Sequence, residues 1–277
     1  MTDHKIPLAG VIGAPIAHSR SPQLHRHWLD TYGIKGFYVP MEVAPAELET
    51  VLRTLPKMGF VGVNVTLPHK EEVLQIADLV TDRAALIGAA NTLTFHEGGK
   101  IHADNTDGYG FLENLRQGAP SWQPVKGPAV VLGAGGAARA VIVALLDAGV
   151  SSILLSNRTR ARAERLQSDF GNRVQVVDWG QAGTVLPRAT LVVNTSSLGM
   201  VGKPEMRLPL DGLQPGTVVT DLVYTPLRTK LLQTAEGKGC LTVDGLGMLL
   251  HQGVPGFERW FGKRPEVTEA TRQAVLS

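Results

Sequence analysis

The second half of the chain, from Val130 onward, alternates short apolar runs with longer amphipathic stretches. Runs such as AVVL, SILLSN, VQVV and TLVVNTS are typical of buried strands, and TRARAERLQSDFG and PLRTKLLQTAEGKG have the spacing of amphipathic helices. Such alternation indicates βαβ units, whose right-handed crossovers place helices on both faces of a parallel sheet. The pattern therefore predicts a doubly wound α/β arrangement for this half.

The first hundred residues also alternate between strand and helix patterns. The segments LAGVIG, FYVPMEV and FVGVNVT predict three strands, and NTLTFHEGGKIHADN predicts a hairpin that turns at Gly98 and Gly99. Ser21 and Pro22 are expected at the N-cap and first position of a helix that ends at Gly33. This half is therefore α/β as well.

A change of pattern divides the chain near residues 105–107, where a helix leads into the linker GAPSWQPVKGP. We predict a first domain over residues 1–106 and a second over residues 107–244. On the pattern alone, the helical stretches of residues 245–277 are compatible with packing on either domain.

Composition and charge narrow the class of protein. The chain has 277 residues, 43% hydrophobic and 19% charged, which excludes intrinsic disorder. Its 27 basic and 25 acidic residues are interspersed, so we expect neither nucleic acid nor a membrane surface as a partner. The apolar runs are too short to span a bilayer, and Cys240 is the only cysteine and is expected to be buried and inert. These features favour a cytoplasmic protein; a homodimer is compatible with the sequence, which does not fix the oligomeric state.

A glycine-rich loop follows the strand AVVL and opens a helix. Gly133, Gly135 and Ala138 form the pattern GxGxxA in the context that a dinucleotide fingerprint requires. The first glycine permits the turn, the second lets the backbone approach a pyrophosphate, and the small third residue lets the helix pack on the strand. A dinucleotide cofactor is therefore expected here, a turn without a ligand being the alternative.

The residues after the next strand indicate which dinucleotide is bound. Enzymes that use NAD carry an acidic residue about 20 positions beyond the loop, which binds the ribose 2′-hydroxyl. This chain has Asn157, Arg158 and Thr159 there, and Arg162 could add a second cation. Because a guanidinium binds a 2′-phosphate that a carboxylate would repel, the segment predicts NADP. The alternative is a solvated basic start of a helix, although basic residues there oppose the helix dipole.

Polar residues in the first half cluster at the ends of the predicted strands, where open α/β sheets bind ligands. Each has a simpler explanation as well: Ser21 as a helix cap, Asn64 as a turn residue, and Lys70 as a solvated lysine opening the helical run KEEVLQIAD. Together they predict a site for a small polyhydroxylated ligand. The cluster comprises Ser19, Ser21, Asn64, Thr66, Lys70, Asn91 and Asp107.

The sequence resembles the shikimate dehydrogenase family. The matching segments are VIGAPIAHSRSPQLH, GVNVTLPHK, IGAANTL, DNTDGYGF, LGAGGAARA, SNRT, NTSSLGM, DLVYTP and GLGMLLHQG. They occur in order from Val11 to Gly253 and so cover essentially the whole chain. Arg26, which follows His25, departs from the family pattern, because relatives commonly have asparagine at this position. It lies on the first predicted helix and is not among the expected ligands, so we expect no effect on the chemistry.

The resemblance implies an α/β protein with a substrate domain, an NADP-binding Rossmann-like domain and a deep cleft between them, the helices of residues 245–277 joining the first domain. It implies reversible reduction of 3-dehydroshikimate to shikimate with NADPH, in the chorismate pathway of aromatic amino acid biosynthesis. Lys70 and Asp107 would be the catalytic pair. Substrate ligands would be Ser19, Ser21, Asn64, Thr66, Asn91, Tyr224 and Gln252. Cofactor ligands would be Asp82, Gly133, Ala134, Gly135, Gly136, Ala137, Asn157, Arg158, Thr159, Arg162, Thr195, Ser196, Leu222, Gly245 and Met248.

The chemistry suits a lysine and a carboxylate. Hydride transfer to a ketone develops negative charge on its oxygen, which a cationic donor stabilises and then protonates. We expect Lys70 to act first as that donor and second in proton transfer, with Asp107 orienting it. His18 and His69 flank the expected site and are the other acid or base candidates, but neither has an evident orienting carboxylate in the sequence.

Three other functions are compatible with parts of the sequence. A broader quinate and shikimate dehydrogenase using NAD would share the fold, although Arg158 argues against NAD. A catalytically inactive NADP-binding sensor would not need Lys70 and Asp107, and methylenetetrahydrofolate dehydrogenase shares the two-domain outline without the SRS segment. No metal is expected, because the histidines lack a ligand spacing and cysteine partners.

Overall fold

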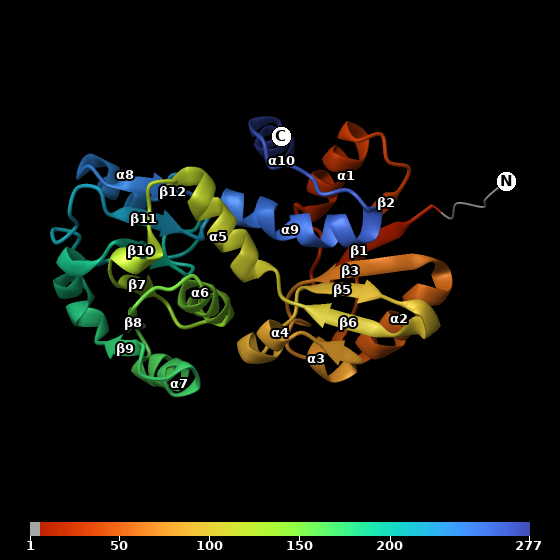
Figure 1. Ribbon diagram of the computed structural model, residues 1–277, viewed down its shortest axis with the longest axis horizontal. Coiled ribbons are helices and arrows are strands. Elements are labelled where there is room, and N and C mark those ends of the chain that lie inside the picture. The colour runs from red at the N-terminus through yellow and green to blue at the C-terminus, as the bar shows by residue number, and fades with distance from the viewer. Residues whose placement is uncertain (1–5) are drawn as a thin grey trace. The chain divides into compact units, whose positions relative to one another are not determined.

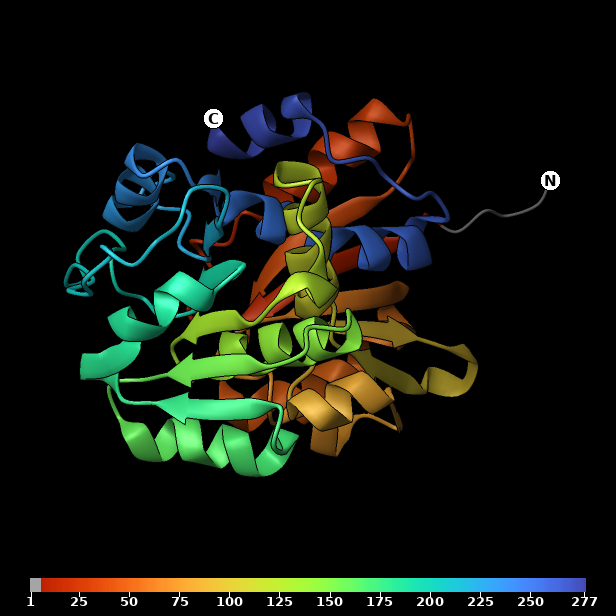
Figure 2. The same ribbon diagram turned by 60° about the vertical axis from the view of Figure 1, so that its left-hand side comes forward.

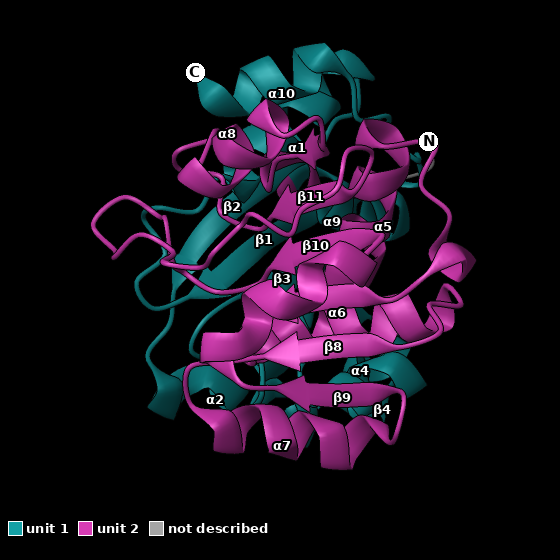
Figure 3. Cartoon of the chain, turned by 90° about the vertical axis from the view of Figure 1, so that its left-hand side faces the viewer, with its two compact units in different colours: residues 1–106, 250–277 teal, residues 107–249 magenta. Residues whose placement is uncertain are grey.

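The computed structural model describes residues 6–277, which form two compact units (Figure 1). Unit 1 comprises residues up to 106 and 250–277, and unit 2 comprises residues 107–249 (Figure 3). Each unit contains one sheet of six strands. Unit 1 is discontinuous in sequence, because its last segment follows unit 2 along the chain.

Unit 1 has a mixed sheet in the order β2-β1-β3-β5-β6-β4. Strand β5 runs antiparallel to both β3 and β6, and the other pairs are parallel. The predicted hairpin is confirmed, and Gly98 and Gly99 at its turn have φ of 75°, a conformation that favours glycine. The strands are β1 (Leu8–Gly13), β2 (Phe37–Glu42), β3 (Phe60–Val65), β4 (Leu79–Val80), β5 (Thr92–Phe95) and β6 (Ile101–Asp104).

Helices cover both faces of this sheet because side chains alternate along its strands. Ile12 of β1 packs with the leucines of α2, whereas Ala9 and Val11 pack with Trp260 of α9 on the other face. The helices are α1 (Ser21–Thr31), α2 (Leu48–Thr54), α3 (Val73–Ile76), α4 (Asp82–Ile87), α9 (Leu246–Phe261, which begins in unit 2) and α10 (Glu269–Leu276).

Two local predictions for unit 1 are wrong. Arg20, not Ser21, is the N-cap of α1, and Ser21 is its first residue, with its amide donating to the Ser19 Oγ at 3.3 Å. The run KEEVLQIAD forms only the short helix α3, so Lys70 lies in a turn before it. The chain leaves the helix early because the Asp78 amide pairs with the Ile101 carbonyl, which starts β4 beside β6.

Unit 2 has a wholly parallel sheet in the order β12-β11-β10-β7-β8-β9, the order of a doubly wound dinucleotide-binding fold (Figure 2). One face packs against α5, α6 and α7, and the other against α8 and a 3₁₀ segment, Trp179–Arg188. The elements are β7 (Ala129–Leu132), β8 (Ile153–Ser156), β9 (Val174–Val177), β10 (Leu191–Asn194), β11 (Val218–Asp221), β12 (Leu241–Val243), α5 (Asp107–Gly118), α6 (Gly136–Asp147), α7 (Arg160–Phe170) and α8 (Lys230–Gly237). The doubly wound prediction is confirmed, and Cys240 is buried as expected.

The chain end completes unit 1. The Trp260 indole of α9 donates to the Leu93 carbonyl at 3.0 Å, and Arg259 bonds the buried Asp104 carboxylate at 2.6 Å. Arg83 binds the same carboxylate through two bonds of 2.7 Å. Burial raises the pKa of Asp104, but the hydrogen bonds from Arg83 and Arg259 outweigh it and hold the pKa well below its usual range.

Gly62 of β3 lies where α9 packs against the sheet of unit 1. A Cβ at Gly62 would overlap both the Trp260 indole nitrogen and the Leu93 carbonyl oxygen, the two partners of the bond just described. We therefore expect Gly62→Ala to lower the free energy of unfolding by about 1–3 kcal/mol, as overpacking does. Gly237→Ala, where a Cβ meets no atom within 4 Å, is the control and should change stability by less than about 1 kcal/mol. Urea denaturation followed by circular dichroism measures both; equal effects would contradict the packing argument.

His25 gives unit 1 a pH-dependent stability. Its ring is fully buried, stacks on Tyr38 with 3.8 Å between centroids, and has no hydrogen-bond partner on either nitrogen among residues 6–277. Burial lowers its pKa to about 3 from 6.5. Between these values the unfolded chain binds a proton that the folded chain does not, so stability falls as pH falls below 6.5.

His25→Phe should remove that dependence. Denaturation at pH 7 and pH 5 should show that the wild type loses about 2 kcal/mol more over this interval than the variant, at roughly 1.4 kcal/mol per pH unit below 6.5. Parallel pH profiles for the two proteins would show that His25 does not remain neutral in the folded state.

Candidate functional site

Three amide side chains of unit 1 form one buried network. Asn64, near the end of β3, donates to the Asn91 carbonyl at 3.0 Å and accepts from the Tyr38 hydroxyl at 2.7 Å. Asn91, just before β5, donates to the Gln252 side chain at 3.1 Å. Thr106 donates through its amide to the Asn91 side-chain oxygen at 2.8 Å. Residues predicted from three distant segments are thus joined, with their side-chain orientations fixed by hydrogen bonds.

Ser19 and Thr66 lie on the loops that follow β1 and β3, and Ser21 is the first residue of α1. The Thr66 methyl lies so close to Gly13 that a Cβ there would be 2.6 Å from it, and the Ala14 amide donates to the Leu67 carbonyl at 3.1 Å. These contacts hold the loop that leads to Ser19 and Ser21 beside Thr66. Ser21 is buried and hydrogen-bonds the Tyr38 side chain.

Lys70 is placed by its backbone next to this network. Its carbonyl accepts from the Ala90 amide at 2.8 Å, one residue before Asn91, and its side chain is half-buried. His69 is fully buried and its Nε2 lies 2.8 Å from the Val43 carbonyl, whereas His18 is exposed. His69 is thus enclosed, whereas Lys70 is partly exposed to solvent.

Asp82 and Asp107 lie at helix starts. Asp82 is exposed at the first position of α4, and within residues 6–277 it forms no hydrogen bond to the other candidates. Asp107 is half-buried and opens α5 of unit 2.

The glycine-rich loop of unit 2 fits a pyrophosphate. Gly133 has φ of 118°, and a Cβ there would lie 2.7 Å from the Thr195 hydroxyl oxygen, so only glycine suits the position. At Gly135 and Gly136 a Cβ would meet no atom within 4 Å, which leaves the backbone open to a ligand. Helix α6 begins at Gly136, and the unpaired amides of its first turn, including that of Ala137, attract an anion.

Asn157 connects this loop to the basic segment. Its side-chain oxygen accepts from the Ala134 amide at 3.1 Å, and its side-chain nitrogen donates to the Thr159 carbonyl at 2.8 Å. Arg158 and Arg162 are exposed, and no carboxylate within residues 6–277 forms a salt bridge with either. Arg160, by contrast, forms salt bridges with Glu164 and Asp178. Two guanidiniums are therefore available for a 2′-phosphate.

The remaining candidates surround the ends of β10 and β11. The Thr195 hydroxyl donates to the Leu132 carbonyl at 3.1 Å, and Ser196 donates to the Asn194 side-chain oxygen at 2.7 Å. A Cβ at Gly245 would overlap the Leu222 carbonyl, so glycine permits the close approach of these two segments. Tyr224 and Met248 are half-buried in the same unit.

A buried carboxylate that the sequence analysis missed supports these loops. The Asp221 carboxylate accepts hydrogen bonds from the Asn194 side-chain nitrogen at 2.8 Å and from the Thr229 hydroxyl at 2.7 Å. Burial raises the pKa of Asp221, partly offset by these bonds. The signal in the sequence was a polar residue ending each of two apolar strands, which are direct neighbours in register, Asn194 opposite Asp221.

Among the described residues, no helix is long and apolar enough to cross a membrane, and no group of three metal-ligating side chains occurs.

Known proteins match this chain over its full length. The family described as shikimate dehydrogenase substrate binding domain matches residues 11–93, shikimate / quinate 5-dehydrogenase matches residues 123–206, and shikimate 5'-dehydrogenase C-terminal domain matches residues 245–276. A shikimate dehydrogenase (NADP(+)) of Roseobacter denitrificans is 77% identical over the full length of both chains. One from Ruegeria is 65% identical, also over the full length of both.

Two solved structures are similar throughout. Shikimate 5-dehydrogenase of Thermus thermophilus, in complex with NADP(H) and shikimate, has a TM-score of 0.86 at 38% identity and covers 98% of both chains. Quinate dehydrogenase of Corynebacterium glutamicum, in complex with NAD, has a TM-score of 0.89 at 32% identity, covering 98% of this chain and 99% of the other.

Proposed function

The chain belongs to the shikimate dehydrogenase family, and we propose that it reduces 3-dehydroshikimate to shikimate reversibly with NADPH, in the biosynthesis of chorismate and the aromatic amino acids. The observation that carries the proposal is full-length identity of 77% to an NADP-dependent shikimate dehydrogenase. The open glycine loop and the uncompensated Arg158 and Arg162 of this chain support the same cofactor.

We propose that residues 1–106, with the C-terminal helices of 245–277, bind the substrate, and that residues 107–244 bind NADP. Ser19 and Ser21 of the first part donate hydrogen bonds from their hydroxyls to the substrate carboxylate, and Tyr224, which belongs to residues 107–244, is assigned to the same end of the substrate. Thr66 and the network of Asn64, Asn91 and Gln252 bind ring hydroxyls; the hydrogen bonds that join these buried amides fix their orientation, which reduces the entropy cost of binding.

The proposed cofactor residues divide by the part of NADP they contact. Gly133 to Ala137 bind the pyrophosphate, and residues 157–162 bind the 2′-phosphate through Asn157, Arg158, Thr159 and Arg162. Thr195, Ser196, Leu222, Gly245 and Met248 lie toward the nicotinamide half, and Asp82 is a weaker contact. When bound, the cofactor supplies the hydride.

The chemical role of the chain is electrostatic and acid–base. The Lys70 ammonium donates a hydrogen bond to the carbonyl oxygen of 3-dehydroshikimate and gives its proton to that oxygen as negative charge develops there. In the reverse direction the Lys70 amine accepts the proton of the substrate hydroxyl. Asp107 orients Lys70 and the neighbouring hydroxyl.

We also propose a cytoplasmic location, supported by the single buried thiol of Cys240. Light scattering of the purified protein decides between monomer and homodimer.

The test is NADP reduction followed by absorbance with shikimate and quinate in parallel, and with NAD as the exchanged cofactor. Turnover that requires both shikimate and NADP is the expected result. Comparable turnover with quinate or NAD would assign the broader dehydrogenase activity, and NADP binding without turnover on either substrate would assign a sensor.

A further inference from the structure

A pocket of about 480 Å³ lies at the carboxyl ends of β8, β9 and β10 in unit 2. Its lining comes from three loops: Arg158 follows β8, Trp179 follows β9, and the rest follow β10. These last residues are Leu198, Pro204, Glu205 and Arg207. Of the six, only Arg158 is among the cofactor ligands expected from the family resemblance.

The loop that carries Arg207 is held in place by the core. Met206 and Leu208 pack on the hydrophobic cluster beneath the sheet, and side chains of an extended segment alternate, so Glu205 and Arg207 are both left exposed. The Gly199 amide donates to the Pro204 carbonyl at 2.8 Å, which closes the preceding turn. Trp179 is half-buried and packs on the same cluster. The backbone that carries Arg207 and Trp179 is therefore held in place by packing on the core.

The chemistry of the lining suits a purine with a phosphate attached. The Trp179 ring, with Leu198 and Pro204, provides flat apolar surface for an aromatic base. Arg158 and Arg207 provide two guanidiniums against one carboxylate, Glu205, and no salt bridge within residues 6–277 engages any of the three. A guanidinium binds phosphate through two parallel hydrogen bonds.

We propose that Arg207 and Trp179 set the preference for the 2′-phosphorylated cofactor: Arg207 binds the 2′-phosphate together with Arg158, and Trp179 contacts the adenine. This inference rests on the proposed NADP dependence and adds two selectivity residues to it. The Glu205 carboxylate repels the phosphate, which weakens cofactor binding and speeds release of the cofactor.

Binding of a cofactor fragment tests this without catalysis. Adenosine 2′,5′-bisphosphate carries the 2′-phosphate, and adenosine 5′-monophosphate lacks it; calorimetry gives the Kd of each for the full chain. Arg207→Ala should weaken the bisphosphate about 10-fold or more and the monophosphate less than about 2-fold, because only the charge-assisted bond is lost. Glu205→Gln should tighten the bisphosphate severalfold.

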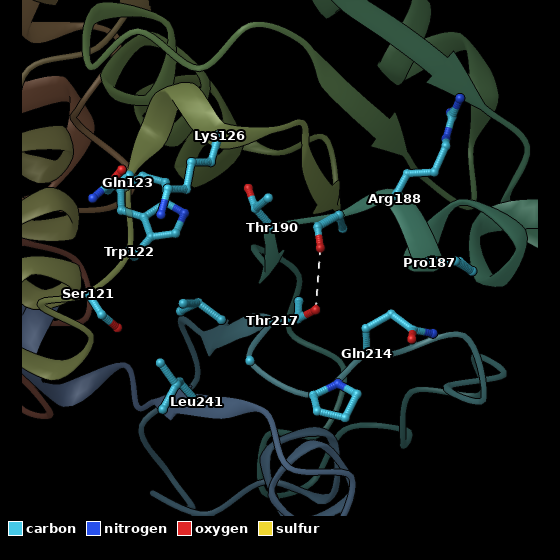
Figure 4. Close-up of a pocket in the computed structure, with 14 residues that line it drawn as sticks. Ser121, Trp122, Gln123, Lys126, Pro187, Arg188, Thr190, Gln214, Thr217 and Leu241 are labelled. Carbon is cyan, nitrogen blue, oxygen red and sulfur yellow. Dashed lines mark hydrogen bonds between the residues drawn. The ribbon is translucent and has the colours of Figure 1, made fainter.

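Arg188→Ala is the matched control. Arg188 is an exposed arginine of the same unit, and it lines a different pocket of about 410 Å³ at the amino ends of β10, β11 and β12 (Figure 4). Ligands of open α/β sheets bind at the opposite, carboxyl edge, so this variant should bind both nucleotides as the wild type does.

Tryptophan fluorescence tests the assignment of Trp179 separately. The bisphosphate should quench tryptophan emission, Trp179→Phe should abolish most of the quenching while keeping binding within about threefold, and Trp179→Ala should weaken both nucleotides. Trp122→Phe, in the control pocket, should retain the quenching.

Equal losses of both nucleotides in Arg207→Ala, or an unchanged Kd for the bisphosphate, would overturn the assignment of Arg207. Unchanged quenching in Trp179→Phe would overturn that of Trp179. If shikimate turnover with NADP is normal in the unmodified enzyme while these results are negative, the proposed function stands and only the inference fails. If the unmodified enzyme binds neither nucleotide, both fail.

Discussion

Lys70→Ala should lower kcat for shikimate oxidation by two to four orders of magnitude while changing KM for shikimate less than about fivefold. General acid–base catalysis by a positioned side chain contributes about 10²–10⁴-fold. The asymmetry follows from the geometry, because the ring hydroxyls are assigned to the hydrogen-bonded network of Asn64, Asn91 and Gln252, which the substitution leaves intact. Steady-state kinetics with saturating NADP measures both constants.

Lys57→Ala is the control for the loss of a lysine, because Lys57 is exposed in unit 1 at the end of the segment following α2. It should retain wild-type kinetics. Turnover of Lys70→Ala within about tenfold of wild type would exclude Lys70 as the catalytic donor. A large rise in KM at constant kcat would instead make it a substrate-binding residue.

Arg158→Asp should raise KM for NADP by about 100-fold or more and lower KM for NAD. The substitution replaces a guanidinium at the end of β8 by the acidic side chain that binds a ribose 2′-hydroxyl in NAD-dependent folds. It removes a charge-assisted hydrogen bond, worth roughly 1.5–3 kcal/mol, and adds a repulsion between like charges. The measurement is kcat/KM for both cofactors at a fixed shikimate concentration and fixed ionic strength.

Arg165→Asp makes the same change of charge on α7, the helix that follows Arg158, at an exposed position outside the cofactor set. It should alter KM for NADP only slightly, because exposed charges at a distance are screened by salt. If Arg158→Asp and Arg165→Asp had equal effects, the net charge of residues 158–170, and not a specific contact of Arg158, would explain the cofactor preference.

The sequence predicted unit 2 almost element by element, because its strands are short apolar runs bounded by glycine or polar residues, and the four central ones are buried on both faces. The 3₁₀ segment Trp179–Arg188 was missed since its glycines and Pro187 interrupt any helical period. The run KEEVLQIAD had helical spacing, but tertiary pairing of Asp78 with Ile101 ended the helix after one turn.

Candidate site residues could be named where a motif carried them, and the structure brings Asn64, Asn91 and Gln252 into direct contact. The supporting pairs could not be named in advance. Asn194 meets Asp221 only because β10 and β11 are neighbours in register, and Trp260 meets Leu93 only because the tail returns to unit 1. Such pairings depend on strand order and chain return, which periodicity does not encode.

The return of the tail also sets an order of events during synthesis. Unit 2 is one uninterrupted stretch, residues 107–249, and can fold as soon as it leaves the ribosome. Unit 1 begins to emerge first but lacks Arg259, the partner of its buried Asp104, and Trp260, which closes on Leu93, until the last thirty or so residues are made. The part of the chain translated first is therefore finished last, and until then its sheet exposes the surface that α9 later covers.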